Sequence, residues 1–285
     1  MTKTTRPALL LAALLLLALL AEAMTLTMPL SQVKPGMKGR GKSVFQGRAA
    51  EDFEVEILGI MENVTPRRSV ILARLKGRGL ETTGIIGGMS GSPVYIDGKL
   101  IGAVAYGFSF SKEPIAGITP IEEMLAVGAA PEGPARGGAA PLTLREDLSQ
   151  EDLSGAYLRA LAVAAAPAET DRTVAPLELP LMFGGFPAAA FEKARSFFAP
   201  LGFRPLRSGA AAQVPLGSDP AGPSLREGDA VGVQLVGGDL DLSAVGTVTY
   251  VDGARVLAFG HPVYNLGRVD YAMTRADVIA VVPSL

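Results

Sequence analysis

The 285-residue sequence contains no cysteine. Disulfide bonds, thiol nucleophiles and thiolate metal sites are therefore excluded, and the fold must depend on its own hydrophobic core. The only histidine is His261, so a metal site would need oxygen atoms for all its other ligands. We accordingly expect no metal catalysis and no cofactor.

Tryptophan is absent too, and aromatic residues make up only 6% of the chain. The net charge is −2, so no excess of positive charge favours binding of nucleic acid or anionic lipid. The scarcity of aromatic side chains also argues against a surface on which bases stack. What remains is a chain that is 48% hydrophobic and long enough for two compact domains.

The N-terminal segment has a composition of its own. Lys3 and Arg6 precede an unbroken run of Leu and Ala over residues 9–20, and Ala21-Glu22-Ala23 follows it. The run is shorter than the roughly 20 residues that cross a bilayer, and small residues end it. We predict a cleavable signal peptide over residues 1–23, cut after Ala23, in preference to an uncleaved anchor. The protein is then exported to the periplasm or outside the cell, with no stable membrane span.

Residues 24–127 are predicted to form a β domain. Apolar and charged residues alternate over residues 53–57, which is typical of a half-buried strand. Asp97-Gly98 lies between apolar runs at residues 94–96 and 100–106. This pattern predicts a hairpin with a type I′ turn, in which both turn residues have positive φ.

The middle of the chain is rich in alanine, glycine and proline. Residues 128–145 are predicted to form a linker, and residues 146–227 a partly helical, partly irregular insertion. Within the insertion, helices are expected over residues 148–165 and over residues 188–198, where prolines flank the apolar periodicity.

Residues 228–285 return to a β pattern. Asp252-Gly253 separates two further apolar runs, at residues 245–251 and 256–259, which predicts a second hairpin. His261 follows its return strand. The sequence stops within an apolar run, so we expect this second β unit to be truncated.

One motif has the features of a nucleophile turn: Gly88-Met89-Ser90-Gly91-Ser92-Pro93. A serine hydroxyl reacts only when a base takes its proton and donors stabilise the oxyanion. The glycines let the backbone fold tightly, so that Ser90 Oγ projects and the Gly88 and Ser90 N–H groups converge on an oxyanion hole. A plain Gly/Ser turn is the alternative. The hairpin that follows favours the nucleophile, and Ser90 is preferred over Ser92 because glycine follows it.

Two segments resemble the SpoIVB family of serine peptidases. Residues 83–93 resemble that family's nucleophile segment, and residues 246–250 with 258–261 resemble its histidine segment. The resemblance implies Ser90 as nucleophile, His261 as general base and endopeptidase activity. It also implies a mainly β fold of trypsin-like β-barrel halves, here with the alanine- and proline-rich insertion between them.

The sequence departs from the family in three ways. Ser90 precedes His261 along the chain, the reverse of the family order, although a triad is defined by geometry. No acid lies in residues 75–79, where the family carries an aspartate, so Asp270 or Asp277 is the candidate third member. No PDZ-like module is recognisable.

We therefore predict an exported serine endopeptidase acting on proteins or peptides. The alternative is an inactive, peptidase-like binding or scaffold protein of the cell envelope, and a weaker third candidate is an esterase using the same serine. The absent acid favours the scaffold. The coincidence of the only histidine with the matching segment favours the enzyme.

Overall fold

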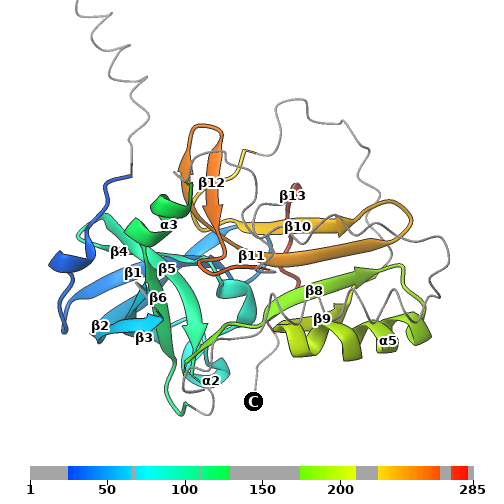
Figure 1. The fold of residues 1–285 in the computed structure, drawn as a ribbon, viewed down its shortest axis with the longest axis horizontal. Coiled ribbons are helices and arrows are strands. Elements are labelled where there is room, and N and C mark those ends of the chain that lie inside the picture. Colours follow the sequence, from blue (N-terminus) through cyan, green and yellow to red (C-terminus); the bar gives the residue numbers. More distant parts are fainter. Residues whose placement is uncertain are drawn as a thin grey trace, which may run out of the picture.

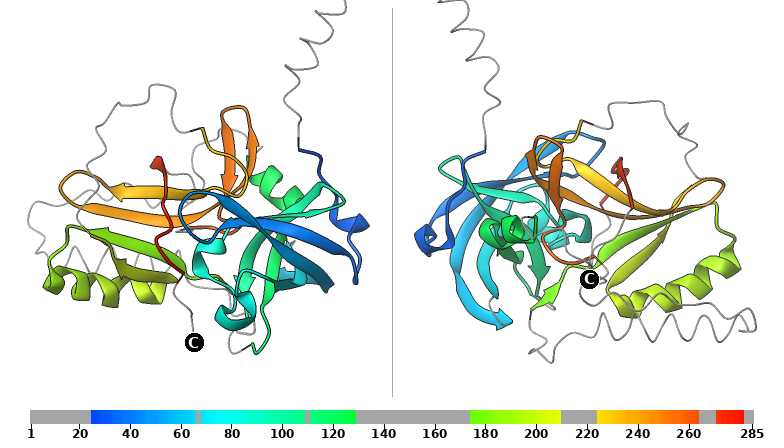
Figure 2. Two further views of the ribbon diagram at one scale, coloured as in Figure 1. Left: turned by 180° about the vertical axis from the view of Figure 1, so that it is seen from behind. Right: turned by 45° about the horizontal axis from the view of Figure 1, so that its top comes forward.

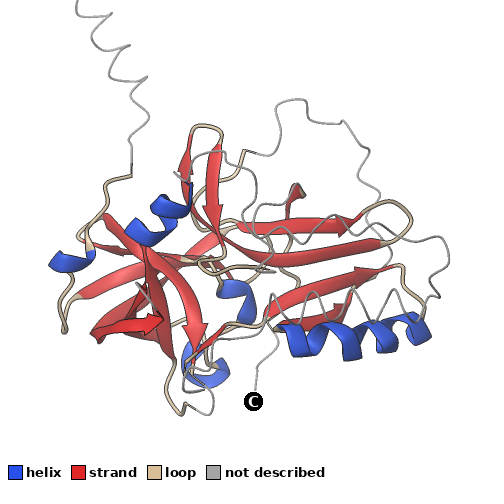
Figure 3. Ribbon diagram, viewed as in Figure 1, coloured by secondary structure: helices blue, strands red, loops and turns tan. Residues whose placement is uncertain are grey.

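The computed structural model describes residues 25–65, 68–108, 111–128, 174–209, 224–263 and 271–281. The predicted signal peptide, the expected helix at residues 148–165 and Asp270 lie outside the described residues. Strands dominate what is described (Figure 3), which confirms the predicted mainly β class. The short helices are η1 (Leu30–Gln32), α2 (Leu80–Thr83), η2 (Gly87–Met89), α3 (Ile121–Gly128) and η3 (Ala199–Leu201).

The first β unit is a closed barrel. Six antiparallel strands follow the order β4-β1-β2-β3-β6-β5, and pairing of β4 with β5 closes the ring (Figure 1). The short strand β7 pairs with the C-terminal end of β5, beyond the stretch that pairs with β4. The strands are β1 (Lys38–Val44), β2 (Ala50–Thr65), β3 (Arg68–Lys76), β4 (Pro93–Ile96), β5 (Lys99–Gly107), β6 (Ile115–Pro120) and β7 (Ala175–Pro176).

Local sequence patterns account for these strands. Phe53, Val55 and Ile57 on β2 are buried in the barrel core, while the glutamates between them face outward, as period-two alternation requires. Asp97 and Gly98 have φ of 49° and 73°, so the β4–β5 hairpin has the predicted type I′ turn.

The second β unit is an open sheet in the described residues. Its order is β13-β10-β11-β8-β9, with β12 paired to β11, and β8 and β9 are parallel. The long helix α5 (Ala188–Phe198) connects β8 to β9 and lies beside them (Figure 1). The strands are β8 (Leu179–Gly184), β9 (Phe203–Arg207), β10 (Ala230–Val236), β11 (Asp241–Asp252), β12 (Arg255–Ala258) and β13 (Ala272–Arg275).

Part of the expected insertion belongs to this second sheet. The helix predicted at residues 188–198 has the bounds of α5, but β8 and β9 were not expected on either side of it. Leu179, Leu181 and Phe183 alternate along β8 and are buried, the pattern of a half-buried strand. Pro180 obscured that pattern, because a proline within an apolar run argues against a strand.

The two units pack against each other around β11. The backbone N–H of Thr247 on β11 donates to Ser90 O at 2.8 Å, and η2 contacts both β11 and β8. Tyr250 on β11 also packs in one apolar cluster with Leu100 of β5 and Ile121 of α3. The view from behind and the view tilted by 45° both show the β11–β12 hairpin beside α3 (Figure 2). The nucleophile turn therefore lies where the two units meet.

Candidate active site

Ser90 lies in a tight turn between η2 and β4. The 3₁₀ helix η2 ends at Met89 with Ser90 as its C-cap, and Gly91 then reverses the chain with φ of 97°, a conformation that favours glycine. Gly91 N–H donates to Val104 O on β5 at 2.7 Å, which holds the turn on the barrel. A side chain at position 91 would overlap the Thr247 carbonyl oxygen and the Phe259 nitrogen of the second unit. The glycine is thus required by crowding as well as by φ.

His261 follows β12 through a strained turn. Phe259 has φ of 67°, and the Gly260 N–H donates to Ala258 O at 2.9 Å, which makes a γ-turn of the rare, strained kind. The Phe259 side chain is buried in the core of the second unit. This packing holds the turn, and the turn directs the His261 ring toward the barrel.

The structure brings Ser90 and His261 together across the junction. Ser90 Oγ lies 3.0 Å from His261 Nε2, a hydrogen-bond distance between side chains 171 residues apart in sequence. The other ring nitrogen, Nδ1, lies 3.0 Å from the Pro262 carbonyl oxygen. A carbonyl only accepts, so Nδ1 carries the proton and Nε2 is left to accept the Ser90 O–H. This is the tautomer that a general base requires.

Burial of His261 between the units lowers its pKa below the usual 6.5, and the hydrogen bond to Pro262 opposes this shift. Burial acts in this direction because it disfavours the charged imidazolium. The ring is therefore neutral at neutral pH and able to accept a proton.

The structure does not bring Asp277 to His261. Its carboxylate forms a bidentate ion pair with Arg48, in which Arg48 Nη2 lies 2.7 Å from Oδ2. The hydrogen bonds from Arg48 lower the pKa of Asp277 below its usual value. Within the described residues no carboxylate hydrogen-bonds to His261, and the Pro262 carbonyl is the acceptor at Nδ1. Asp270, the preferred candidate for the third member, lies outside the described residues.

The two expected oxyanion donors do not converge in this conformation. Ser90 N–H donates to Gly87 O at 3.1 Å as part of the η2 turn, whereas Gly88 N–H has no acceptor among the described residues. The intervening peptide joins Gly87 to Gly88, and its rotation would release Ser90 N–H and redirect Gly88 N–H together. No side chain hinders this at Gly88, since a Cβ there would meet nothing within 4 Å.

Sequence analysis did not single out three threonines that contact the turns around Ser90 and His261. Thr247 and Thr249 on β11 donate through Oγ1 to Gly88 O and Gly91 O, at 2.9 and 2.7 Å. Thr119 on β6 donates through Oγ1 to Gly260 O at 2.7 Å. Thr247 and Thr249 could have been found from their spacing. Two threonines two positions apart in a strand of apolar residues are both buried, and buried hydroxyls need hydrogen-bond partners.

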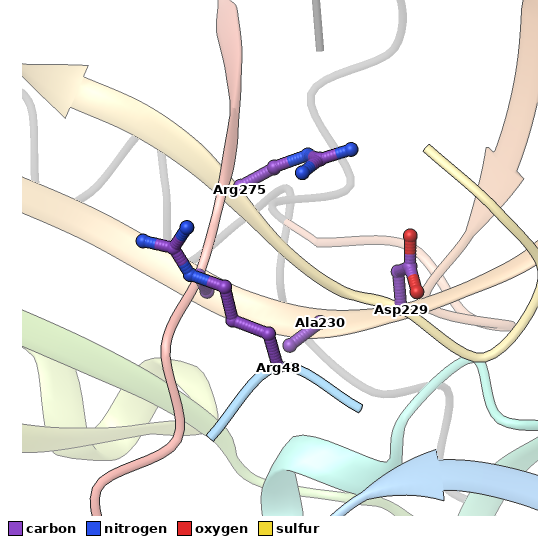
Figure 4. Close-up of a pocket in the computed structure, with 5 residues that line it drawn as sticks. Arg48, Asp229, Ala230 and Arg275 are labelled. Atoms are coloured by element: carbon purple, nitrogen blue, oxygen red, sulfur yellow. The ribbon is translucent and has the colours of Figure 1, made fainter. Parts of the chain in front are cut away.

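The described residues hold no group of three or more His, Asp or Glu side chains arranged to bind a metal ion. A small hollow is lined by Arg48, Asp229, Ala230, Arg275 and Ala276 (Figure 4), and its lining includes neither Ser90 nor His261. No described helix is long and apolar enough to cross a bilayer.

Comparison with known proteins yields one family. Residues 19–125 match the family described as SpoIVB peptidase S55, which confirms the resemblance inferred from the nucleophile segment. The matched stretch contains the barrel strands and Ser90, and His261 lies beyond it. No curated protein and no solved structure matches the chain.

Proposed function

We propose that this chain, which matches the SpoIVB-type serine peptidase family over residues 19–125, is a serine endopeptidase that uses Ser90 as nucleophile and His261 as general base. The observation that carries the proposal is the 3.0 Å distance between Ser90 Oγ and His261 Nε2. The two side chains come from different β units, and each lies beside a glycine that packs closely against the other unit. Nucleophile and base within hydrogen-bond reach are the signature of an activated serine.

The proposed chemistry has two halves. His261 Nε2 takes the Ser90 proton as Oγ attacks a peptide carbonyl, and the imidazolium then gives that proton to the leaving amine. Water next attacks the acyl-enzyme with His261 again as base, which releases the acid and regenerates Ser90. During each half the Pro262 carbonyl accepts the Nδ1–H and keeps the ring oriented. A carbonyl stabilises an imidazolium less than a carboxylate does, so we expect slow turnover.

The oxyanion hole is proposed to form when the Gly87–Gly88 peptide rotates. Rotation frees Ser90 N–H from Gly87 O and brings Gly88 N–H to the same side, so that both donate to the oxyanion. The proposal requires only backbone movement, because glycine occupies both positions. In this structure the Ser90 N–H still donates to Gly87 O. That hydrogen bond is the specific observation that favours the alternative, an inactive scaffold protein of the cell envelope. An esterase using Ser90 would need the same rotation.

We propose protein or peptide as substrate, because the family hydrolyses peptide bonds. We also propose that the chain is exported to the periplasm or the cell exterior and cut after Ala23, on the evidence of its N-terminal composition.

A fluorophosphonate probe tests the function directly. The full-length protein should become covalently labelled, and mass spectrometry of the digested adduct should locate the label on Ser90. His261→Ala should slow the labelling by about 10²–10⁴-fold, the usual contribution of a general base. A folded protein that never labels would support the scaffold alternative. Cleavage of small esters without cleavage of a peptide library would support the esterase.

The pH dependence of labelling tests the role of His261. Only the neutral ring accepts the Ser90 proton, so the rate rises with pH through the pKa of His261 and then levels off. Because burial lowers that pKa, the midpoint of the acid limb should lie below 6.5. Rates measured on the intact protein across the acidic and neutral range give this midpoint. A midpoint near 6.5 would mean that the ring is solvated, and one above 6.5 would mean that it is paired with an acid.

A further inference from the structure

Two threonines of β11 contact the backbone of the nucleophile turn. Thr247 is 2% exposed and Thr249 is fully buried, and both point to the same face because they are two positions apart on a strand. Their hydroxyls donate to Gly88 O and Gly91 O, which flank Ser90 in the sequence. The Thr247 N–H also donates to Ser90 O at 2.8 Å. The second β unit therefore holds the turn by three hydrogen bonds within four residues.

A threonine of the barrel makes the reciprocal contact. Thr119 on β6 is 7% exposed, and its hydroxyl donates to Gly260 O at 2.7 Å. Gly260 directly precedes His261. A residue of the barrel thus holds the loop that carries the base, while residues of the second unit hold the turn that carries the nucleophile.

The turns need such support because of their composition. Glycine is frequent in both turns, so few side chains are present to anchor them, and Phe259 is held at a positive φ that a bulky residue disfavours. Strained backbone of this kind persists only where surrounding contacts determine it. Thr247 links the two turns directly, since its carbonyl accepts the Phe259 N–H at 3.3 Å while its N–H donates to Ser90 O.

We propose that Thr119, Thr247 and Thr249 are positioning residues, whose hydroxyls fix the separation of Ser90 Oγ and His261 Nε2. The proposal presupposes the peptidase function above. No proton is transferred through the threonines. Their hydroxyls only hydrogen-bond to the backbone carbonyls beside Ser90 and His261. A misplacement of about 1 Å costs roughly 10²-fold in rate, so the loss of one such hydrogen bond should be visible in catalysis as well as in stability.

Valine tests the hydroxyl because it keeps the shape of threonine. In Thr247→Val and Thr119→Val, the maximal rate of fluorophosphonate inactivation should fall by about 10–100-fold, with the half-saturating probe concentration changed less than about twofold. Thr247→Ser and Thr119→Ser restore the donor and should recover most of the rate. Thr119 and Thr247 lie in different β units, so either valine variant tests the role of the hydroxyl if the other fails to fold.

Ser243→Ala is the matched control. Ser243 is a buried hydroxyl on the same strand β11, and it donates to Asp241 Oδ1 at 2.7 Å, outside the two turns. Its loss should lower the melting temperature without changing the maximal rate. Valine variants that melt earlier but label at the wild-type rate would overturn the positioning role. A wild-type protein that does not label at Ser90 would instead overturn the peptidase function itself.

Discussion

Replacement of Ser90 by alanine is expected to lower peptide hydrolysis by about 10⁴–10⁶-fold, to the level set by binding and the oxyanion donors alone. Among the described residues, Ser90 Oγ is the only hydroxyl that hydrogen-bonds to the His261 ring, so no other hydroxyl is placed to replace it. Hydrolysis of a fluorogenic peptide library by the purified, full-length variant measures the loss.

Ser92→Ala is the matched control for this variant. Ser92 lies two residues away and is equally buried, but its Oγ is the one buried side-chain polar atom in the described residues without a hydrogen-bond partner. An unsatisfied buried hydroxyl costs about 1–3 kcal/mol, so alanine should keep the activity and leave the melting temperature equal or higher. Activity lost in Ser92→Ala and kept in Ser90→Ala would reverse the assignment of the nucleophile.

Gly91→Ala is expected to abolish activity and to destabilise the protein by more than about 3 kcal/mol. The added Cβ would overlap the Thr247 carbonyl oxygen and the Phe259 nitrogen, and would lie 3.0 Å from Phe259 Cα. All three are backbone atoms of the second β unit and cannot turn aside. The φ of 97° adds strain for any residue other than glycine. The two units must therefore separate, which removes His261 from Ser90. Chemical denaturation and probe labelling measure the two effects.

Gly98→Ala separates crowding from backbone strain. Gly98 also has a positive φ, 73°, but a Cβ there would meet nothing within 4 Å. Its replacement should cost only the left-handed penalty of about 1–2 kcal/mol and leave labelling unchanged. Equal losses in the two variants would show that conformation alone, and not contact between the units, makes glycine necessary at position 91.

The sequence predicted what depends on neighbouring residues. The type I′ turn at Asp97 and Gly98 and the helix at residues 188–198 follow from local chemistry, and both are present. The second Asp-Gly hairpin also forms, although Asp252 still pairs with Arg255 and the turn begins one residue later. Ser90 was singled out because glycines surround it.

Features that depend on long-range packing could not be read in the same way. Nothing local shows that Asp277 is engaged by Arg48, which lies 229 residues earlier in the chain. The engagement of Ser90 N–H by Gly87 O reflects one of two orientations open to a glycine peptide, and the sequence permits both. The parallel pairing of β8 with β9 was missed because Pro180 breaks the pattern that would have revealed the first strand.

The division of the site between two β units has a consequence for the order of events during biosynthesis. All six strands that close the barrel lie between Lys38 and Pro120, whereas the base follows the nucleophile by 171 residues. A chain that emerges from its N-terminus completes the barrel and Ser90 while His261 is still unmade. Under the proposed mechanism the nascent protein therefore cannot cleave neighbouring proteins or its own unfolded segments. Its reactivity begins only when the strands of the second β unit dock on the barrel.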